Sequence, residues 1–308
     1  MQPSVTVRVP GSTSNLGAGF DCVGVAVGRS LRVTARTAPA SAGPAVIIER
    51  RGSLRALDVP PDADLIYQGF LAACRRAGRP EDAARPLMLT ADSDIPVARG
   101  LGSSAAAVVG GAAAANALLG LALDKATVVT LCAELEGHPD NVAPAVYGGA
   151  TLALRGPEGL VVAPLAVHES LALVCAIPDF TVETKQARAV LPPTVPHAQA
   201  ALAAAKSAAL VIGLAHADPR LLAAGLDDVL HVPYRRPLVA GYDEVSDAAR
   251  QAGAHGATLS GSGPTILALA PAARAPQVAD AMARAWRARG IVVECLLVAR
   301  PAGGYEAA

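Results

Sequence analysis

The chain has 308 residues, and its 26 lysines and arginines balance 26 aspartates and glutamates at a pI of about 7.0. This balance excludes an overall field that would attract nucleic acid or an anionic membrane, so any bound anion must be held by local groups. One core rarely grows beyond roughly 250–300 residues, so the length predicts two domains. With 52% hydrophobic but only 3% aromatic residues, the core must consist mainly of Ala, Val and Leu.

The cysteines and histidines give no sign of a metal or disulfide site. The five cysteines are scattered and never spaced as CxxC, and the six histidines show no short paired spacing. These patterns argue against a disulfide framework and against a zinc site. The opening segment, MQPSVTVRVPG, lacks the apolar run of a secretory signal. We therefore expect a cytoplasmic protein that binds neither nucleic acid nor membrane.

Hydrophobic periodicity predicts the elements of the first half in chain order. The expected strands are 5–11, 30–37, 45–50 and 86–92, with a Pro- and Gly-rich loop at 38–44, and the expected helices are 64–78, an alanine-rich helix that ends near Gly120, and 124–137 with Asp124 as its N-cap. Residues 105–123 carry no charge and are long enough to span a bilayer. Because Ala and Gly dominate this stretch and Asn116 interrupts it, we expect a helix packed in the protein interior.

The second half begins after a hairpin expected at 148–165, around Gly156 to Gly159. The strands expected there are 171–179, 257–271 in part and 291–301, and the helices are 184–191, 198–218, 243–254 and 275–290. Strands and helices are mixed rather than strictly alternating, which favours an α+β fold. We divide the chain into domains at residues 1–163 and 164–308.

A glycine-rich bend precedes the alanine-rich helix. Gly100 and Gly102 allow positive φ and close approach of a ligand, and Ser103 and Ser104 follow where a helix exposes unpaired N–H groups. Such an arrangement binds phosphate, although a turn with an ordinary N-cap would have the same sequence. The bend is not a Walker A loop, because GxxxxGK[ST] is absent. A dinucleotide-binding turn is also disfavoured, because residues 91–99 separate the preceding strand from the glycines.

Three further clusters combine glycine with polar side chains. Residues 10–21 place Asn15 and Asp21 beside three glycines, and residues 259–265 form a second glycine-rich loop before an apolar strand. Residues 134–149 hold the polar group Glu134, Glu136, His138, Asp140 and Asn141. Each cluster has a structural alternative as a hairpin loop or a solvated helix end. Together, in a neutral chain, they indicate a nucleotide site with Mg²⁺.

In this order the clusters resemble the three motifs of the GHMP kinases. VRVPGSTSNLGAGFD resembles the first motif, PVARGLGSSAAA the second and LSGSGPTILAL the third. Within that superfamily, EGHPDNVAPAVYGG, TKQAR and HVPYRRPL resemble homoserine kinases. The resemblance implies a two-domain GHMP kinase fold, with an N-terminal ribosomal-S5-like α/β domain and a C-terminal ferredoxin-like domain. It also implies transfer of a phosphoryl group from ATP to the side-chain hydroxyl of L-homoserine, a step toward threonine.

The resemblance also implies residue roles for ATP and its metal. ATP is expected to lie with its phosphates over the second motif, in the cleft between the domains. The positions matched to ATP are Pro96, Arg99, Gly100, Leu101, Gly102, Ser103, Ser104 and Asp64. Ser103 or Ser104 is expected to bind Mg²⁺ together with Glu134, chosen over Glu136 by motif position because residues two apart on a helix face different ways. At Asp64 the chain departs from the family, which often has Asn there, and a carboxylate cannot donate a hydrogen bond.

The roles implied for the second substrate follow from its zwitterionic chemistry. The ammonium requires carboxylate or amide acceptors, and the carboxylate requires guanidinium donors. The positions matched to homoserine are Asn15, Asp21, Asn141, Thr184, Arg188, Arg235 and Gly261. For catalysis, Asp140 is a candidate base, or Asn141 occupies that place and no base exists. A mevalonate-type substrate and a catalytically silent, ligand-binding regulator are the alternatives, and a homodimer is one oligomeric state left open.

Overall fold

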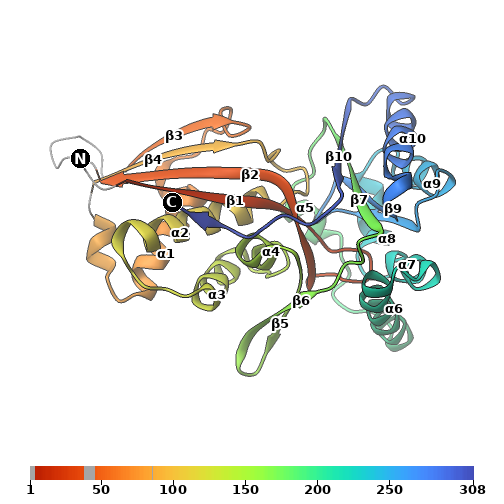
Figure 1. Ribbon diagram of the computed structural model, residues 1–308, viewed down its shortest axis with the longest axis horizontal. Helices are drawn as coiled ribbons and strands as arrows, with labels where there is room; N and C mark the ends of the chain where they lie inside the picture. The colour runs from red at the N-terminus through yellow and green to blue at the C-terminus, as the bar shows by residue number, and fades with distance from the viewer. Residues whose placement is uncertain (1–3, 38–45, 85) are drawn as a thin grey trace.

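The computed structural model describes residues 4–37, 46–84 and 86–308, and it contains two sheets with helices packed against each (Figure 1). The loop expected at 38–44 lies outside the described residues. The strands of the first sheet are β1 (Ser4–Ser14), β2 (Val23–Thr37), β3 (Val46–Gly52), β4 (Leu87–Ser93), β5 (Ala150–Gly156), β6 (Gly159–Leu165) and β11 (Glu306–Ala307). Within the described residues, the strand order is β11-β1-β2-β4-β3, and the β5–β6 hairpin branches from β2. All pairs are antiparallel except β3 with β4.

Helices cover one face of this sheet, as Figure 1 shows. They are α1 (Leu65–Arg76), α2 (Ser103–Leu119), α3 (Lys125–Glu136) and α4 (Val142–Tyr147). In α2, residues 108–115 are all buried, so the uncharged stretch forms an interior helix as predicted. Close packing is possible because small side chains dominate: Gly111 lies against the backbone of Ile66, where a Cβ would clash. The helix ends at Gly120, whose φ is +60°, and α3 starts at the predicted N-cap Asp124.

The second sheet belongs to the C-terminal half. Its strands are β7 (Leu171–Pro178), β8 (Gly256–Leu259), β9 (Ile266–Pro271) and β10 (Val293–Val298), paired antiparallel in the order β10-β7-β9-β8. The helices are α5 (Thr184–Ala189), α6 (His197–His216), α7 (Pro219–Leu226), α8 (Val232–Arg235), α9 (Tyr242–Gln251) and α10 (Ala275–Arg287). Short 3₁₀ helices are η1 (Pro61–Ala63), η2 (Pro80–Ala84), η3 (Arg236–Leu238) and η4 (Ala272–Arg274). The buried Trp286 of α10 anchors the core between α9, α10 and the sheet. This arrangement confirms the prediction of an α+β chain with two domains.

The division between the halves differs in detail from residues 1–163 and 164–308. β6 extends to Leu165, and the chain enters the second sheet at Leu171. After β10 the chain returns to the first sheet, where Ala308 and Thr6 exchange two backbone hydrogen bonds of 2.9 and 3.0 Å. The return covers the edge of β1 around Thr6 to Arg8, which would otherwise present unpaired N–H and C=O groups.

One helix of the described residues, α6, is long and apolar enough to cross a bilayer. It packs along α7 in the C-terminal half (Figure 1). A lone helix of this kind is weak evidence for a membrane span, because core helices of the same length and composition are common.

Candidate active site

A cavity of about 530 Å³ lies between the two halves, and both halves contribute to its walls. The three glycine-rich loops meet there. The Ser12 N–H donates to the Leu101 carbonyl at 3.1 Å, which joins the first loop to the second. The Gly261 N–H donates to the Ser14 carbonyl at 2.8 Å, which joins the third loop to the first. Segments far apart in the sequence therefore form one continuous backbone surface around the cavity.

The second loop opens α2 with the geometry of an anion site. Gly100 and Gly102 have φ of +77° and +69°. A Cβ on Gly100 would collide with the Ser260 carbonyl, and one on Gly102 would collide with the Ser12 hydroxyl. Gly102 is the N-cap of α2 and no side chain caps that helix, so its first N–H groups and the positive end of its dipole are left for a ligand. The predicted ATP residues that line the cavity are Asp64, Pro96, Arg99, Gly100, Leu101, Gly102, Ser103 and Ser104.

The carboxylate that faces this loop is Glu136, not Glu134. The Ser104 hydroxyl donates to Glu136 Oε2 at 2.9 Å, and Glu136 lines the cavity beside Ser103. Glu134 is exposed and lies outside the lining, because two residues along α3 turn its side chain away. The predicted placement of Glu134 is thus corrected. Burial raises the pKa of Glu136, and the hydrogen bond from Ser104 opposes this shift in part.

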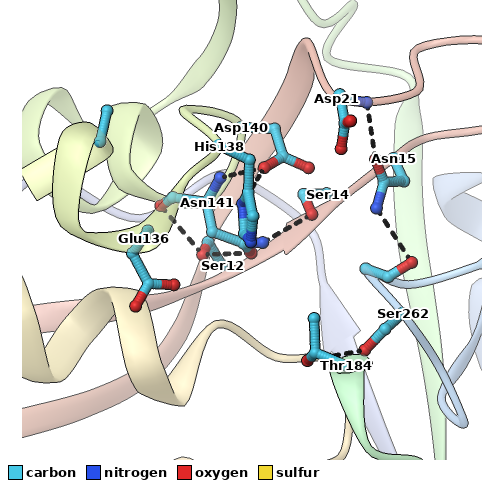
Figure 2. Close-up of polar contacts among 12 residues, drawn as sticks. Ser12, Ser14, Asn15, Asp21, Glu136, His138, Asp140, Asn141, Thr184 and Ser262 are labelled. Carbon is cyan, nitrogen blue, oxygen red and sulfur yellow. Dashed lines mark hydrogen bonds and ion pairs between the residues drawn. The ribbon is translucent and has the colours of Figure 1, made fainter. Parts of the chain in front are cut away.

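His138 lines the cavity and contacts the carboxylate of Asp140 (Figure 2). Its Nδ1 lies 2.7 Å from Asp140 Oδ1, and Asp140 is only 1% exposed and does not line the cavity. Burial raises the pKa of Asp140, but the hydrogen bond and charge of His138 outweigh it, so this pKa is lowered. Burial lowers the pKa of His138, but the bond and charge of Asp140 prevail, so its pKa is raised. Asp140, a predicted catalytic residue, therefore contacts the cavity only through His138, for which the sequence predicted no role.

Asn141 is held firmly by the first loop, as Figure 2 shows. Its Oδ1 accepts from the Ser12 hydroxyl at 2.9 Å, and its Nδ2 donates to the Ser14 hydroxyl at 2.8 Å. Asn141 also lines the cavity next to the start of α2. The amide thus has one fixed orientation, which suits a group that must orient a substrate.

Arg188 lines the C-terminal side of the cavity and is paired with Asp21, which is not itself among the lining residues. Arg188 donates to both carboxylate oxygens of Asp21, at 2.9 and 3.2 Å, and both side chains stay more than a third exposed. Asn15, with φ of +57°, accepts from the Asp21 N–H at 2.7 Å. Thr184 lines the same wall, 3.4 Å from the Ser262 hydroxyl. A carboxylate and a guanidinium side by side suit a zwitterionic ligand.

Arg235 lines the cavity, but it is buried, with only 1% of its surface exposed. It donates to the carbonyls of Ala187 and Gly261 at 3.0 and 3.3 Å, and its guanidinium lies 5.2 Å from the centre of the Phe20 ring. Gly261 also accepts from Asn15 Nδ2 at 3.0 Å. Burial first, and then the charge of neighbouring Arg188, lowers the pKa of Arg235 to about 10.

The end of the cavity beside β3 and α1 is mostly apolar, with one ion pair. Asp64 Oδ1 accepts from the N–H groups of Ile66 and Tyr67 at 2.8 and 3.3 Å and so caps α1. Asp64 Oδ2 accepts from Arg50 Nη2 at 2.7 Å, and the same Nη2 donates to the Val59 carbonyl at 2.9 Å. The apolar lining here includes Leu54, Leu57, Val59, Ala63 and Leu65. This end suits the flat face of a nucleobase.

The sequence is similar to known families and proteins. The family models for the GHMP kinases N terminal domain and the GHMP kinases C terminal match residues 64–149 and 210–288. The chain is 43% identical over 291 residues to the homoserine kinase of Picosynechococcus sp., covering 94% of each chain. It is 42% identical over 304 residues to that of Synechococcus sp., covering 98% of this chain and 97% of the relative.

Solved structures agree. The homoserine kinase of Cytophaga hutchinsonii superposes with a TM-score of 0.87 at 30% identity, covering 100% of this chain and 98% of the other. The mevalonate kinase of L. major, solved with R-mevalonate, superposes with a TM-score of 0.69 at 18% identity over 96% of each chain, which shows a shared fold alone. With both family models and full-length relatives in agreement, this chain belongs to the GHMP kinases and, among them, to the homoserine kinases.

Proposed function

We propose that this chain transfers the γ-phosphoryl group of ATP to the side-chain hydroxyl of L-homoserine. One observation carries the proposal: a single cavity joins an uncapped helix N-terminus to the guanidinium of Arg188, which is paired with the carboxylate of Asp21. The first feature suits a polyphosphate and the second suits a free amino acid. The homoserine kinases that match the full chain support the same reaction.

ATP would extend along the cavity from the apolar end to α2. The N–H groups at the start of α2 and the glycine backbone would bind the phosphates, with Ser103 and Ser104 beside them. Arg99 lines the same stretch and donates to the Pro178 carbonyl. The phosphoryl group to be transferred would then lie near Asn141, at the junction of the first and second loops.

The metal requirement fits a small set of oxygen donors. No group of three or more His, Cys, Asp or Glu side chains suited to a metal occurs in the described part of the chain. Mg²⁺ needs no such cage, because it is usually held by one or two carboxylates, substrate phosphates and water. Glu136 and the hydroxyl of Ser104 or Ser103 would supply the protein ligands. When bound, Mg²⁺ would neutralise charge on the β- and γ-phosphates.

Homoserine would bind on the opposite side of the transferred group. Asp21 and the Asn15 amide would accept from its ammonium, while Arg188 would donate to its carboxylate. Arg235 would add positive potential from beneath, and Thr184 and Gly261 would complete the wall. A mevalonate-type acid lacks the ammonium, so Asp21 would make no contact with it and would keep only its ion pair with Arg188.

Positioning would account for most of the catalysis. Asn141, fixed by two serines, would orient the attacking hydroxyl. Asp140 would act on His138 rather than on the substrate, since His138 lines the cavity and Asp140 does not. We assign no direct proton transfer to Asp140.

A substrate screen tests the proposal. The purified chain would be incubated with ATP, Mg²⁺ and one acceptor at a time: L-homoserine, L-serine, L-threonine or mevalonate. Formation of a phosphomonoester from homoserine, seen by ³¹P NMR, with a kcat/KM at least tenfold above the other acceptors, is expected. Preferred phosphorylation of mevalonate would reassign the substrate, and nucleotide binding without any acceptor would favour a regulator.

A further inference from the structure

Among the described residues, the carboxylate of Asp64 at the apolar end of the cavity, beside β3 and α1, has no free oxygen to accept from a ligand. Both oxygens of Asp64 are engaged: Oδ1 by the N-terminus of α1 and Oδ2 by Arg50, through Nη2 at 2.7 Å and Nε at 3.2 Å. Asp64 is 6% exposed. It therefore cannot accept from a nucleobase without giving up a helix cap or an ion pair.

Arg50, unlike Asp64, has hydrogen-bonding groups that are not engaged within the protein. Its Nε and Nη2 are used, while its Nη1 has no hydrogen-bond partner among residues 4–37, 46–84 and 86–308. The side chain is 15% exposed and lines the cavity among leucines. A guanidinium with unused N–H groups that faces an apolar slot can donate to an acceptor on a ligand.

We infer that Arg50 is a nucleobase-binding residue, which donates from Nη1 to a ring nitrogen of the purine, and that Asp64 is the residue that positions it. An asparagine at position 64 could cap α1 with its oxygen and still donate with its nitrogen. Here the carboxylate retains the cap, and the guanidinium that it holds restores the donor. The inference rests on the proposed use of ATP.

Combining protein variants with ATP analogues that are altered in the base tests this assignment. Dissociation constants would be measured by competition with a fluorescent nucleotide, for ATP and its 1-deaza, 3-deaza and 7-deaza analogues. Each ligand would be tested on the wild type, Arg50→Met and Arg51→Met. Arg51 is the matched control, because it neighbours Arg50 but is 58% exposed and pairs with Glu49.

The expected pattern is specific. For the wild type, one deaza analogue binds roughly tenfold or more weakly than ATP, the loss of a hydrogen bond to a charged donor. Arg50→Met loses a similar factor for ATP and loses nothing further for that analogue. Arg51→Met behaves as the wild type, and the KM for homoserine is the same in all three. If Arg50→Met alone folds poorly, Arg50→Met combined with Asp64→Ser removes both charges and retains a capping oxygen.

Two results would overturn the assignment. Equal weakening of ATP and all three analogues by the Arg50 substitution would make the ion pair purely structural, and so would no weakening at all. Either result in a chain that still phosphorylates homoserine refutes the role of Arg50 and leaves the proposed reaction standing. A wild-type chain that binds no ATP would refute the proposed reaction itself.

Discussion

Substitution of Arg188 separates amino-acid binding from both stability and nucleotide binding. In Arg188→Met the ion pair with Asp21 is lost, and since both partners are more than a third exposed, the free energy of unfolding should fall by no more than about 1 kcal/mol. Charge-assisted bonds to a substrate carboxylate contribute roughly 1.5–3 kcal/mol, so kcat/KM for homoserine should fall roughly 10- to 150-fold. The KM for ATP should hardly change, because the proposed ATP site lies along α2.

Substitutions of Arg235 and Arg236 serve as comparisons for the Arg188 substitution. Arg235→Met would take its donor from the Ala187 carbonyl, at roughly 1–3 kcal/mol for a buried group, whereas the Gly261 carbonyl would keep its hydrogen bond from Asn15 Nδ2. Its effect on activity would therefore include a loss of stability. Arg236→Met is the control, because Arg236 is 53% exposed, lies 3.5 Å from Asp243 and should be near neutral. Arg188→Lys should rescue poorly, since a point charge does not replace a planar fork.

The assay is steady-state kinetics with each substrate varied in turn, together with the melting temperature of each variant. An Arg188 variant that folds normally and retains the kcat/KM of the wild type for homoserine would refute the proposed carboxylate contact. An equal rise in the KM of ATP would show that Arg188 serves the nucleotide instead.

The other predictions concern the phosphate loop, the metal carboxylate and the histidine. Glu136→Gln should lower activity in a way that added Mg²⁺ partly restores, while Glu134→Gln at the exposed position should not; the reverse result in Mg²⁺ titrations would reinstate Glu134. Gly102→Val should abolish ATP binding, because a side chain would strike the Ser12 hydroxyl and fill the phosphate position, and unchanged affinity in a folded variant would contradict this. Because the pKa of His138 is raised, its contribution to stability is complete below its unfolded pKa of about 6.5 and is lost as pH rises through its folded pKa. Melting temperatures from pH 5 to 9 should therefore show a decline in the wild type that is absent from His138→Gln.

Features governed by local sequence were predictable. Asp124 and Gly120 mark the ends of neighbouring helices because an N-cap and a left-handed C-cap depend on a few adjacent residues. The hairpin closes at Gly156 and Gly159 for the same reason. By contrast, β11 is two residues long with no pattern of its own, and its existence depends on the free edge of β1.

In the candidate site, too, locally encoded features were predictable and those that depend on distant contacts were not. The glycine loops were visible in the sequence, and the structure brings all three to one cavity. The choice between Glu134 and Glu136 could not be made from spacing, because it depends on where Ser104 lies across from α3. The pairing of Arg50 with Asp64 had no local signal either, since an irregular segment separates β3 from α1. His138 was visible in HPDN, but its position in front of Asp140 required the three-dimensional structure.

The return of the chain to β1 after β10 also means that the halves are not autonomous folding units. Glu306 and Ala307 complete a sheet whose other strands come from the first half, and the Tyr305 N–H donates to the Ala145 carbonyl of α4. A fragment that ended after β6 would expose the full edge of β1, and we expect it to self-associate through that edge. A fusion that pulls residues 303–308 away would loosen α4, the helix that begins directly after Asn141. A change at the C-terminus would therefore disturb the position of Asn141 in the candidate active site.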